Sequence, residues 1–219
     1  MNQLGEFPGH NKIHSLRITI RRIQSVVTFV RSDVHKPSKK TLNNLKVLGK
    51  HLGRCRELDV AISDAKNLKL NDHALKRTRS KYGKRLARYL HQKRTKQTLK
   101  KLSKSVNGIK LDEHLLSSPP LSHLHKQLTN WRRTSIQSKS QIHIFRTMIK
   151  KTRYVLEAVG KPAAPLKKLQ THLGRAHDME VLAKLVGSNT KISQIEQNHI
   201  RQAKKLISRS IRFALKQTL

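Results

Sequence analysis

The feature that most constrains the fold of this chain is an internal repeat of two short blocks. The first block reads IHSLRITIRRIQSVV over residues 13–27 and IHIFRTMIKKTRYVL over residues 142–156. The second block reads HLGRCRELDV over residues 51–60 and HLGRAHDMEV over residues 172–181. In both halves of the chain the first block precedes the second, so the sequence predicts two copies of one structural unit.

Apolar residues in the first block recur with the period of an α-helix. Ile13, Leu16, Ile20 and Ile23 follow a three- and four-residue spacing, which places them on one helix face. Strand patterns are weak, and only nine Gly and six Pro interrupt the chain. We therefore predict an all-α fold. The expected helices cover residues 12–32, 41–51, 54–68, 72–106, 121–138, 140–159, 165–173, 176–187 and 191–217.

Breaks in the helical pattern indicate how the chain is organised. Residues 117–120 read Ser-Ser-Pro-Pro and form the clearest linker. We expect one domain over residues 1–219, with repeat halves at about 12–116 and 121–219. Ser38 is a candidate cap for the second helix. A helix is expected before the second His block but not before the first, so the first half is predicted to be shortened at its N-terminus.

Two glycines stand at matched points of the second block. Gly53 and Gly174 each follow His-Leu. A glycine that adopts a left-handed conformation commonly ends a helix. We therefore expect one helix to end at each of these glycines and the next to begin directly after it.

The charge of the chain indicates a polyanionic partner. Lys and Arg number 48 against 12 Asp and Glu, which gives a formal net charge of +36. Repulsion among so many like charges destabilises a compact fold unless counter-charge is close. The candidate partners are nucleic acid, an anionic membrane surface and a polymer such as polyphosphate. The alternative is a generally cationic protein without such a partner.

Several kinds of site and location are not favoured by the sequence. Cys55 is the single cysteine, so neither an intrachain disulfide nor a cysteine zinc site is expected. The N-terminus lacks a signal peptide pattern, and no run approaches the roughly 20 apolar residues of a membrane-spanning helix. We expect a cytoplasmic protein without membrane contact. His177 and Asp178 form a lone His-Asp pair, too little for a metal site, and no nucleophile–base pattern or phosphate-binding glycine loop occurs. No metal, cofactor or catalysis is therefore expected.

The first block also repeats its basic residues, which makes them candidate anion ligands. His14, Arg17 and Arg21 lie beside the apolar stripe rather than opposite it, where charges line a groove. The second copy has His143, Arg146 and Lys150 in these positions. A lone histidine is more often a core residue, but repetition with the same spacing favours a site. If a pseudo-two-fold axis relates the halves, the two stripes would face each other across a shared cavity. Arg22 and Lys151 lie further round the helix, where a solvent-facing role is equally compatible.

The second block repeats acidic as well as basic residues. Glu57 and Asp59 match Asp178 and Glu180. In so basic a chain we expect these acids either to orient nearby basic side chains or to cap helices after the two glycines. The basic residues that extend the candidate site are Lys46, Arg54, Arg56, Lys167, Arg175 and His177.

The doubled pattern resembles the CHAD domain, the conserved histidine α-helical domain. It reads His-x-x-Arg-x-x-x-Arg/Lys-Arg/Lys, then Leu-Gly-x-x-Arg/His-Asp/Glu-x-Asp/Glu-Val, and the resemblance covers about residues 12–217. It implies two pseudo-symmetric antiparallel helical bundles that bind inorganic polyphosphate through a central basic groove or pore, without catalysis. Association with polyphosphate granules is compatible with this. Glu57 and Glu180 stand where the family usually has Asp, and the Glu-x-Glu-x-Lys motif of an often fused triphosphate hydrolase domain does not occur.

A protein that binds the nucleic-acid backbone without reading its sequence is the alternative function. Net charge fits both partners, so nucleic acid is expected at least as a competitor for polyphosphate. Aromatic residues make up only 4% of the chain, with one Trp, which argues against stacking of single-stranded bases. The sequence leaves open the oligomeric state, the polymer length and the biological role.

Overall fold

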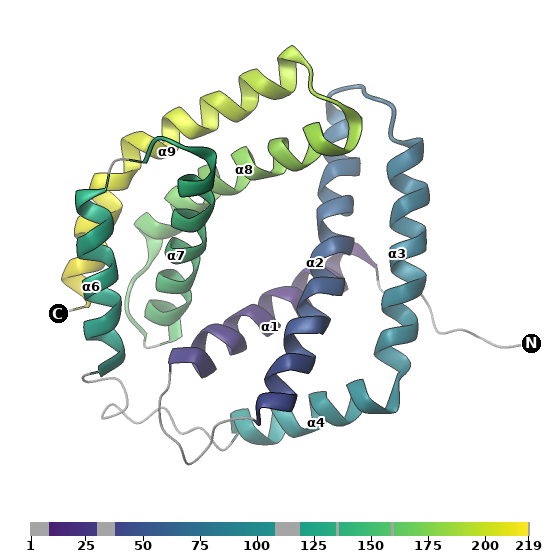
Figure 1. Ribbon diagram of the computed structural model, residues 1–219, viewed down its shortest axis with the longest axis horizontal. Coiled ribbons are helices and arrows are strands. Elements are labelled where there is room, and N and C mark those ends of the chain that lie inside the picture. Colours follow the sequence, from purple (N-terminus) through teal and green to yellow (C-terminus); the bar gives the residue numbers. More distant parts are fainter. Residues whose placement is uncertain (1–8, 30–37, 108–118, 135, 159, 219) are drawn as a thin grey trace, which may run out of the picture. The chain divides into compact units, whose positions relative to one another are not determined.

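The chain folds entirely into α-helices and their connections wherever the structure describes it (Figure 1). A computed structural model describes residues 9–29, 38–107, 119–134, 136–158 and 160–218. The predicted all-α fold is therefore confirmed. None of the described helices combines the length and apolar character needed to cross a bilayer.

The described helices belong to two compact units. The first comprises residues 1–27 and 32–110, and the second comprises residues 28–31 and 111–219. The helices of the first unit are α1 (His10–Phe29, its last two residues excepted), α2 (Lys39–Asn67), α3 (His73–His91) and α4 (Lys93–Asn107). Those of the second are α6 (Pro119–Arg133), α7 (Lys139–Ala158), α8 (Ala164–Val186) and α9 (Thr190–Gln217).

In the first unit, α1 packs on α2 through the apolar stripe of the first block. Ile13 and Ile20 are buried in one cluster with Leu48 and Leu52 of α2. Leu86 adds α3 to this core. Complete burial of each such side chain stabilises the fold by roughly 1.5–3 kcal/mol. The apolar stripe predicted from the sequence therefore fixes which face of α1 meets α2, and with it the position of the neighbouring basic residues.

The second unit uses the equivalent stripe on α7. Phe145 and Ile149 are fully buried and pack in one cluster with Leu169 of α8 and Ile211 of α9. Trp131 of α6 packs against Phe145, with ring centroids 5.2 Å apart. The first-block helix of this unit is thus also held by its apolar face.

The predicted helix ends at the two glycines are wrong. α2 and α8 continue without a break through Gly53 and Gly174. Left-handed glycines occur instead at Gly160 and Gly187, with φ of 70° and 90°. A glycine inside a helix costs about 1 kcal/mol relative to alanine, but burial of leucines on both sides, such as Leu52, outweighs this cost. The acids of the second block consequently do not cap helices.

Two other predicted boundaries differ from the structure. The helix predicted over residues 72–106 is divided at Gln92, whose backbone is extended (φ −61°, ψ 134°). Pro119 and Pro120 begin α6 rather than belonging to the linker, since proline fits the first helical turn. Ser117 and Ser118 lie outside the described residues.

The predicted cap of the second helix is confirmed. The Oγ atom of Ser38 accepts a hydrogen bond from the backbone N–H of Thr41, at 3.2 Å. This bond satisfies one of the N–H groups that have no partner within the first turn of a helix.

The two units differ in the order of their helices. In the second unit α6 precedes the first-block helix α7, whereas no described helix precedes α1. The fourth helix of the first unit is α4, which follows α3 and packs against α2 and α3. The predicted shortening at the N-terminus concerns a part of the chain in which residues 1–8 lie outside the described residues, and it stays a prediction. The internal duplication, its pseudo-symmetry and the single-domain organisation stay predictions.

Candidate functional site

Helix packing in the first unit brings together basic residues of both sequence blocks. His14 and Arg17 lie on α1, and Arg56 lies on α2. Arg56 Nη1 is 2.5 Å from Nε2 of His10, which precedes His14 by one turn. Burial lowers the pKa of His14, and the positive charges of Arg56, Arg17 and His10 lower it further. We call His10, His14, Arg17 and Arg56 the first cluster.

An acid of the second block is fixed beside the first cluster. Asp59 Oδ1 accepts a hydrogen bond of 2.6 Å from Nε of Arg79, which lies on α3, and each side chain is only 10% exposed. Asp59 Oδ2 is also 3.8 Å from Nδ1 of His10. The expectation that these acids orient neighbouring basic side chains is confirmed at Asp59.

The second unit brings together the equivalent residues of its own blocks. His143 and Arg146 lie on α7, and His177 lies on α8 with its ring centroid 5.6 Å from that of His143. Burial lowers the pKa of His177 to about 4, with Arg146 and His143 adding to the effect and Glu180 opposing it. We call His143, Arg146 and His177 the second cluster.

A small pocket opens at the second cluster. All three cluster residues line it, together with Lys139, Glu180 and Glu196. Lys139 Nζ lies 2.7 Å from Glu196 Oε1. Glu180 accepts a 2.6 Å hydrogen bond from Lys184 Nζ and lies 3.5 Å from His177 Nδ1. The hydrogen bond from Lys184 lowers the pKa of Glu180. Each of the two acids at this pocket is thus engaged by a cation or an imidazole.

Comparison with known proteins shows the family of this chain. The sequence model of the CHAD domain family matches residues 8–187, which is most of the chain. This chain belongs to the CHAD domain family. The crystal structure of the CHAD domain from the plant Ricinus communis has the same fold, with a TM-score of 0.67 and 20% sequence identity. The match covers 98% of this chain and 84% of that one. A comparison with curated proteins gave no match.

The other basic residues that were predicted to bind the polyanion belong to neither cluster of this CHAD domain. Arg54 Nη1 lies 3.6 Å from Glu57 Oε2, and the guanidinium is 5.4 Å from the ring centre of Tyr82 on α3. Arg21, Lys150 and Arg175 are half-buried on their helices. The exposed members are Arg22, Lys46, Lys151 and Lys167. The shared cavity predicted between the two His stripes depends on how the units are placed, and it stays a prediction.

Sequence reasoning missed His10, Lys139 and Arg79. A signal for the first two was available, because His10 precedes His14 by four residues just as Lys139 precedes His143. The repeat of basic residues therefore extends one turn further towards the N-terminus than the apolar stripe suggested. Arg79 lies in a run of Lys and Arg, and nothing in the sequence distinguishes it as the partner of Asp59.

The histidine that opens each second block has a packing role within its own unit. His51 of α2 lies against Tyr89 of α3, with ring centroids 4.8 Å apart. His172 of α8 lies against His199 of α9, with Nδ1 atoms 3.1 Å apart. Burial lowers the pKa of His199, with His172 and Arg175 adding to the effect. Among the described residues, no group of three or more His, Cys, Asp or Glu is placed to hold a metal ion.

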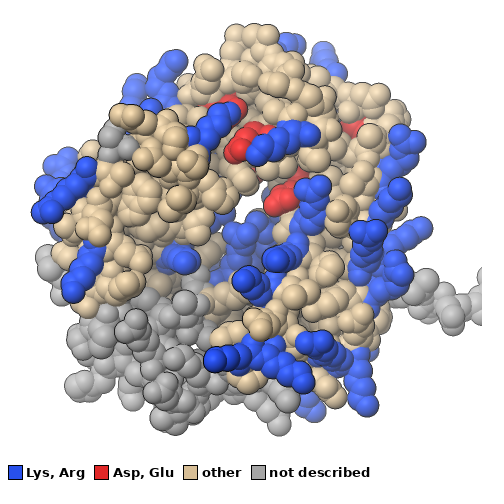
Figure 2. Space-filling model, viewed as in Figure 1, with Lys and Arg blue, Asp and Glu red and all other residues tan. Residues whose placement is uncertain are grey.

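Among the charged side chains on the visible surface, Lys and Arg far outnumber Asp and Glu in both units (Figure 2). The Lys and Arg side chains are spread over the helices of both units. The two clusters are therefore concentrated points within a generally basic surface, and any test of the site must separate local from diffuse charge.

Proposed function

We propose that this CHAD domain binds inorganic polyphosphate through the first and second clusters. One observation carries the proposal: each unit, taken by itself, places the His and Arg of its first block beside a basic residue of its second block. The two blocks are separated by 23 residues in the first half of the sequence and by 15 residues in the second. A surface that was merely cationic would not need this pairing twice.

The chemistry of the clusters suits a chain of phosphates. Phosphate oxygens accept hydrogen bonds, and an arginine can donate two parallel N–H groups to them. Arg17, Arg56 and Arg146 remain charged at any physiological pH. The histidines can donate an N–H when neutral, and they gain charge when a nearby anion raises their pKa. Both clusters can therefore bind phosphate groups without a metal.

Acids beside the clusters support this role because each already has a basic partner. Asp59 is bonded to Arg79, and Glu180 is bonded to Lys184. A carboxylate that is paired in this way repels an approaching anion less than an isolated one. We assign Asp59 and Glu180 the task of holding basic side chains in place.

We further propose that binding leaves the polymer intact. The clusters consist of hydrogen-bond donors, and the neighbouring carboxylates are engaged in ion pairs. Incubation of the protein with polyphosphate of defined length, with and without a divalent metal, checks this directly. Constant chain length on a gel is expected, and progressive shortening by the purified protein would overturn it.

Competition binding separates polyphosphate from nucleic acid as the preferred partner. Labelled long-chain polyphosphate is displaced by unlabelled polyphosphate, duplex DNA or RNA at equal phosphate concentration and about 0.15 M salt. We expect polyphosphate to displace the label at a concentration at least tenfold lower than either nucleic acid. Equal displacement by all three would mean that diffuse charge determines binding.

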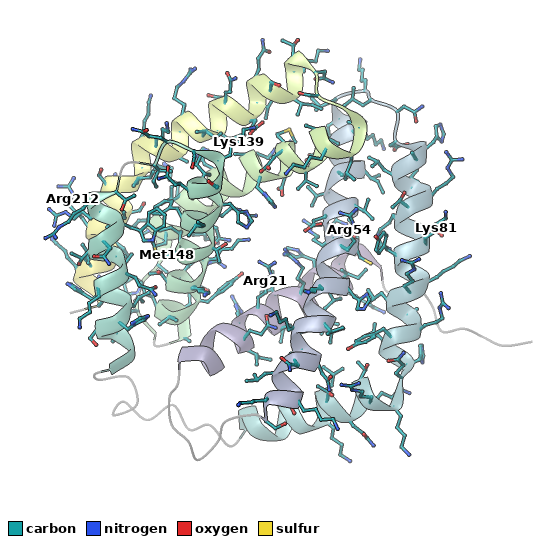
Figure 3. The ribbon with its side chains drawn as sticks, viewed as in Figure 1. Arg21, Arg54, Lys81, Lys139, Met148 and Arg212 are labelled. Carbon is teal, nitrogen blue, oxygen red and sulfur yellow. The ribbon has the colours of Figure 1, made fainter. Side chains whose placement is uncertain are left out.

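Two double variants test whether the preference for polyphosphate over nucleic acid depends on the two clusters. Arg17→Ala/Arg146→Ala removes one arginine from each cluster, and Lys81→Ala/Arg212→Ala removes the same charge from exposed positions on α3 and α9 that point away from their own units (Figure 3). We expect the first variant to lose the preference and the second to keep it. Retention of the preference by both variants would refute the site assignment.

A further inference from the structure

We propose that the outer face of α3 is a second polyanion surface, which binds the sugar-phosphate backbone of duplex nucleic acid. This proposal goes beyond polyphosphate binding, and it uses no residue of either cluster. The proposal rests on a row of exposed cationic side chains along one face of α3.

The row consists of four residues on the side of α3 opposite the core. Arg77, Lys81, Lys84 and Arg88 are spaced by four, three and four residues, which keeps them on one helix face. All four are exposed, whereas Leu86 on the other side is buried. At 1.5 Å per residue the row is about 16 Å long. Figure 3 shows Lys81 pointing away from α2. We call these four residues the α3 ridge.

Among the described residues, no acidic side chain neutralises the α3 ridge. None of its residues makes an ion pair or a side-chain hydrogen bond with another described residue. The sequence contains no Asp or Glu between Asp72 and Asp112, and Asp72 already pairs with Lys76. The ridge therefore attracts an external polyanion, and its binding would release condensed counterions from that partner.

The surroundings of the ridge favour a duplex backbone over a single strand. Tyr82 and Tyr89 are the aromatic residues of α3, and both are half-buried towards the core. They contact other side chains, Tyr89 with His51 and Tyr82 with Arg54. Stacking platforms for unpaired bases are consequently missing from the described part of this helix. Phosphate contacts alone suffice for sequence-independent duplex binding.

The same helix is a poor candidate for insertion into a membrane. An interfacial helix buries its apolar face in the headgroup region. The apolar face of α3 is already occupied, because Leu75 and Leu86 are buried in the protein. Only the cationic face is available to a partner, and an electrostatic ridge without an apolar face fits a phosphate backbone.

A matched control exists on α9. Arg201, Lys205, Arg209 and Arg212 are also exposed, so their replacement by alanine removes the same four charges. These four residues are spaced by four, four and three residues, so they also lie on one helix face, and Glu196 precedes them on the same helix. The α3 ridge variant is Arg77→Ala/Lys81→Ala/Lys84→Ala/Arg88→Ala. Alanine favours helix, and circular dichroism with thermal unfolding checks that each full-length variant folds. Four glutamine replacements serve as a second variant.

The experiment measures affinity for duplex DNA and duplex RNA between about 0.05 and 0.3 M salt. We expect the α3 variant to bind at least one duplex with an affinity at least about tenfold lower at about 0.15 M salt. The slope of the logarithm of the binding constant against the logarithm of the salt concentration should decrease in magnitude by about 3 to 4. The duplex whose affinity falls, DNA or RNA, is the one that the α3 ridge binds. The α9 variant should change affinity less than threefold. Polyphosphate affinity of the α3 variant should also change less than threefold, which separates this proposal from the function proposed above.

Three results would overturn the proposal. Equal weakening by the α3 and α9 variants would show that net charge alone binds the duplex. Equal weakening of duplex and polyphosphate binding by the α3 variant would show one extended surface rather than a second one. Unchanged duplex binding, with loss of binding to vesicles of anionic lipid instead, would assign the ridge to a membrane surface.

Discussion

The two clusters are built from the same sequence blocks, but they differ at one position that decides their charge. The first cluster has Arg56 where the second has His177. Arginine stays protonated throughout the physiological range, whereas burial and Arg146 lower the pKa of His177 to about 4. Near neutral pH, the ligand-free first cluster therefore carries a fixed charge at this position and the second carries none.

Acids beside the two clusters are held in different ways. Asp59 is bonded to Arg79 from another helix, and both side chains are 10% exposed. Glu180 is bonded to Lys184, which is one turn away on the same helix and whose side chain is 70% exposed. The acid beside the first cluster is therefore held by the packing of its unit. The second cluster, in contrast, can gain charge at His177 when an anion binds.

The largest expected effect is the loss of stability when the ion pair between Asp59 and Arg79 beside the first cluster is removed. Arg79→Met keeps most of the side-chain volume but leaves Asp59 buried beside fewer positive charges. Loss of one partner from a buried ion pair destabilises a fold by about 3–5 kcal/mol. Chemical unfolding of this variant should therefore show a loss of this order. Lys184→Met is the matched change in the second unit and should leave stability nearly unaltered, because its side chain is solvated. Equal losses in the two variants would contradict the difference between the clusters.

The next effect is a loss of stability at acid pH that originates from His177. Its pKa is about 6.5 in the unfolded chain and about 4 in the folded one, so the unfolded state takes up the proton first. The contribution is zero well above pH 6.5, and the loss grows as pH falls towards 4, to at most about 3 kcal/mol. Unfolding of wild type and His177→Gln between pH 4 and 7.5 checks this. The variant should show a shallower acid dependence, and parallel curves would refute the assignment.

Exchange of the two residues should exchange the pH behaviour of binding. A bound polyanion raises the pKa of His177, so wild-type affinity for polyphosphate should rise as pH falls from 8 to 5.5. His177→Arg should bind about fivefold tighter at pH 8 and depend less on pH, because one phosphate contact gains a fixed charge. Arg56→His should do the reverse. Flat wild-type affinity over this range would remove the histidines from the electrostatic account.

The smallest effect concerns the helices that carry the second blocks. Ser38 caps α2 with its side chain, whereas Ala163 at the start of α8 has no side-chain cap bond. Ser38→Ala should reduce the stability of the protein by about 1 kcal/mol, measured by thermal or chemical unfolding. Ala163→Gly, at the uncapped position, controls for backbone effects. No measurable change on Ser38→Ala would mean that Thr41 finds another partner.

Much of the fold could be predicted from the sequence because helical periodicity and burial coincide. Ile13, Ile20, Phe145 and Ile149 were expected on apolar stripes, and all four are buried. The failures have a physical cause as well. Gly53 was interpreted from its local conformational preference, but the buried leucines around it keep α2 continuous.

The candidate site could be predicted only where the repeat marked it. His14, Arg17 and Arg56 share one cluster, as the paired blocks suggested, and so do their counterparts in the second unit. Arg79 could not have been selected, because its role depends on which turn of α3 faces Asp59. That alignment follows from the packing of α3 on α2 and not from any local pattern.

The most direct test of the central claim is calorimetric titration of polyphosphate into wild type, Arg17→Ala, Arg146→Ala and the double variant at about 0.15 M salt. If both clusters bind the polymer, each single variant should weaken binding about fivefold, and the double variant should weaken it further. Lys81→Ala/Arg212→Ala, with the same charge as the double variant, should stay close to wild type. Equal affinities for the double variant and this control would contradict the account.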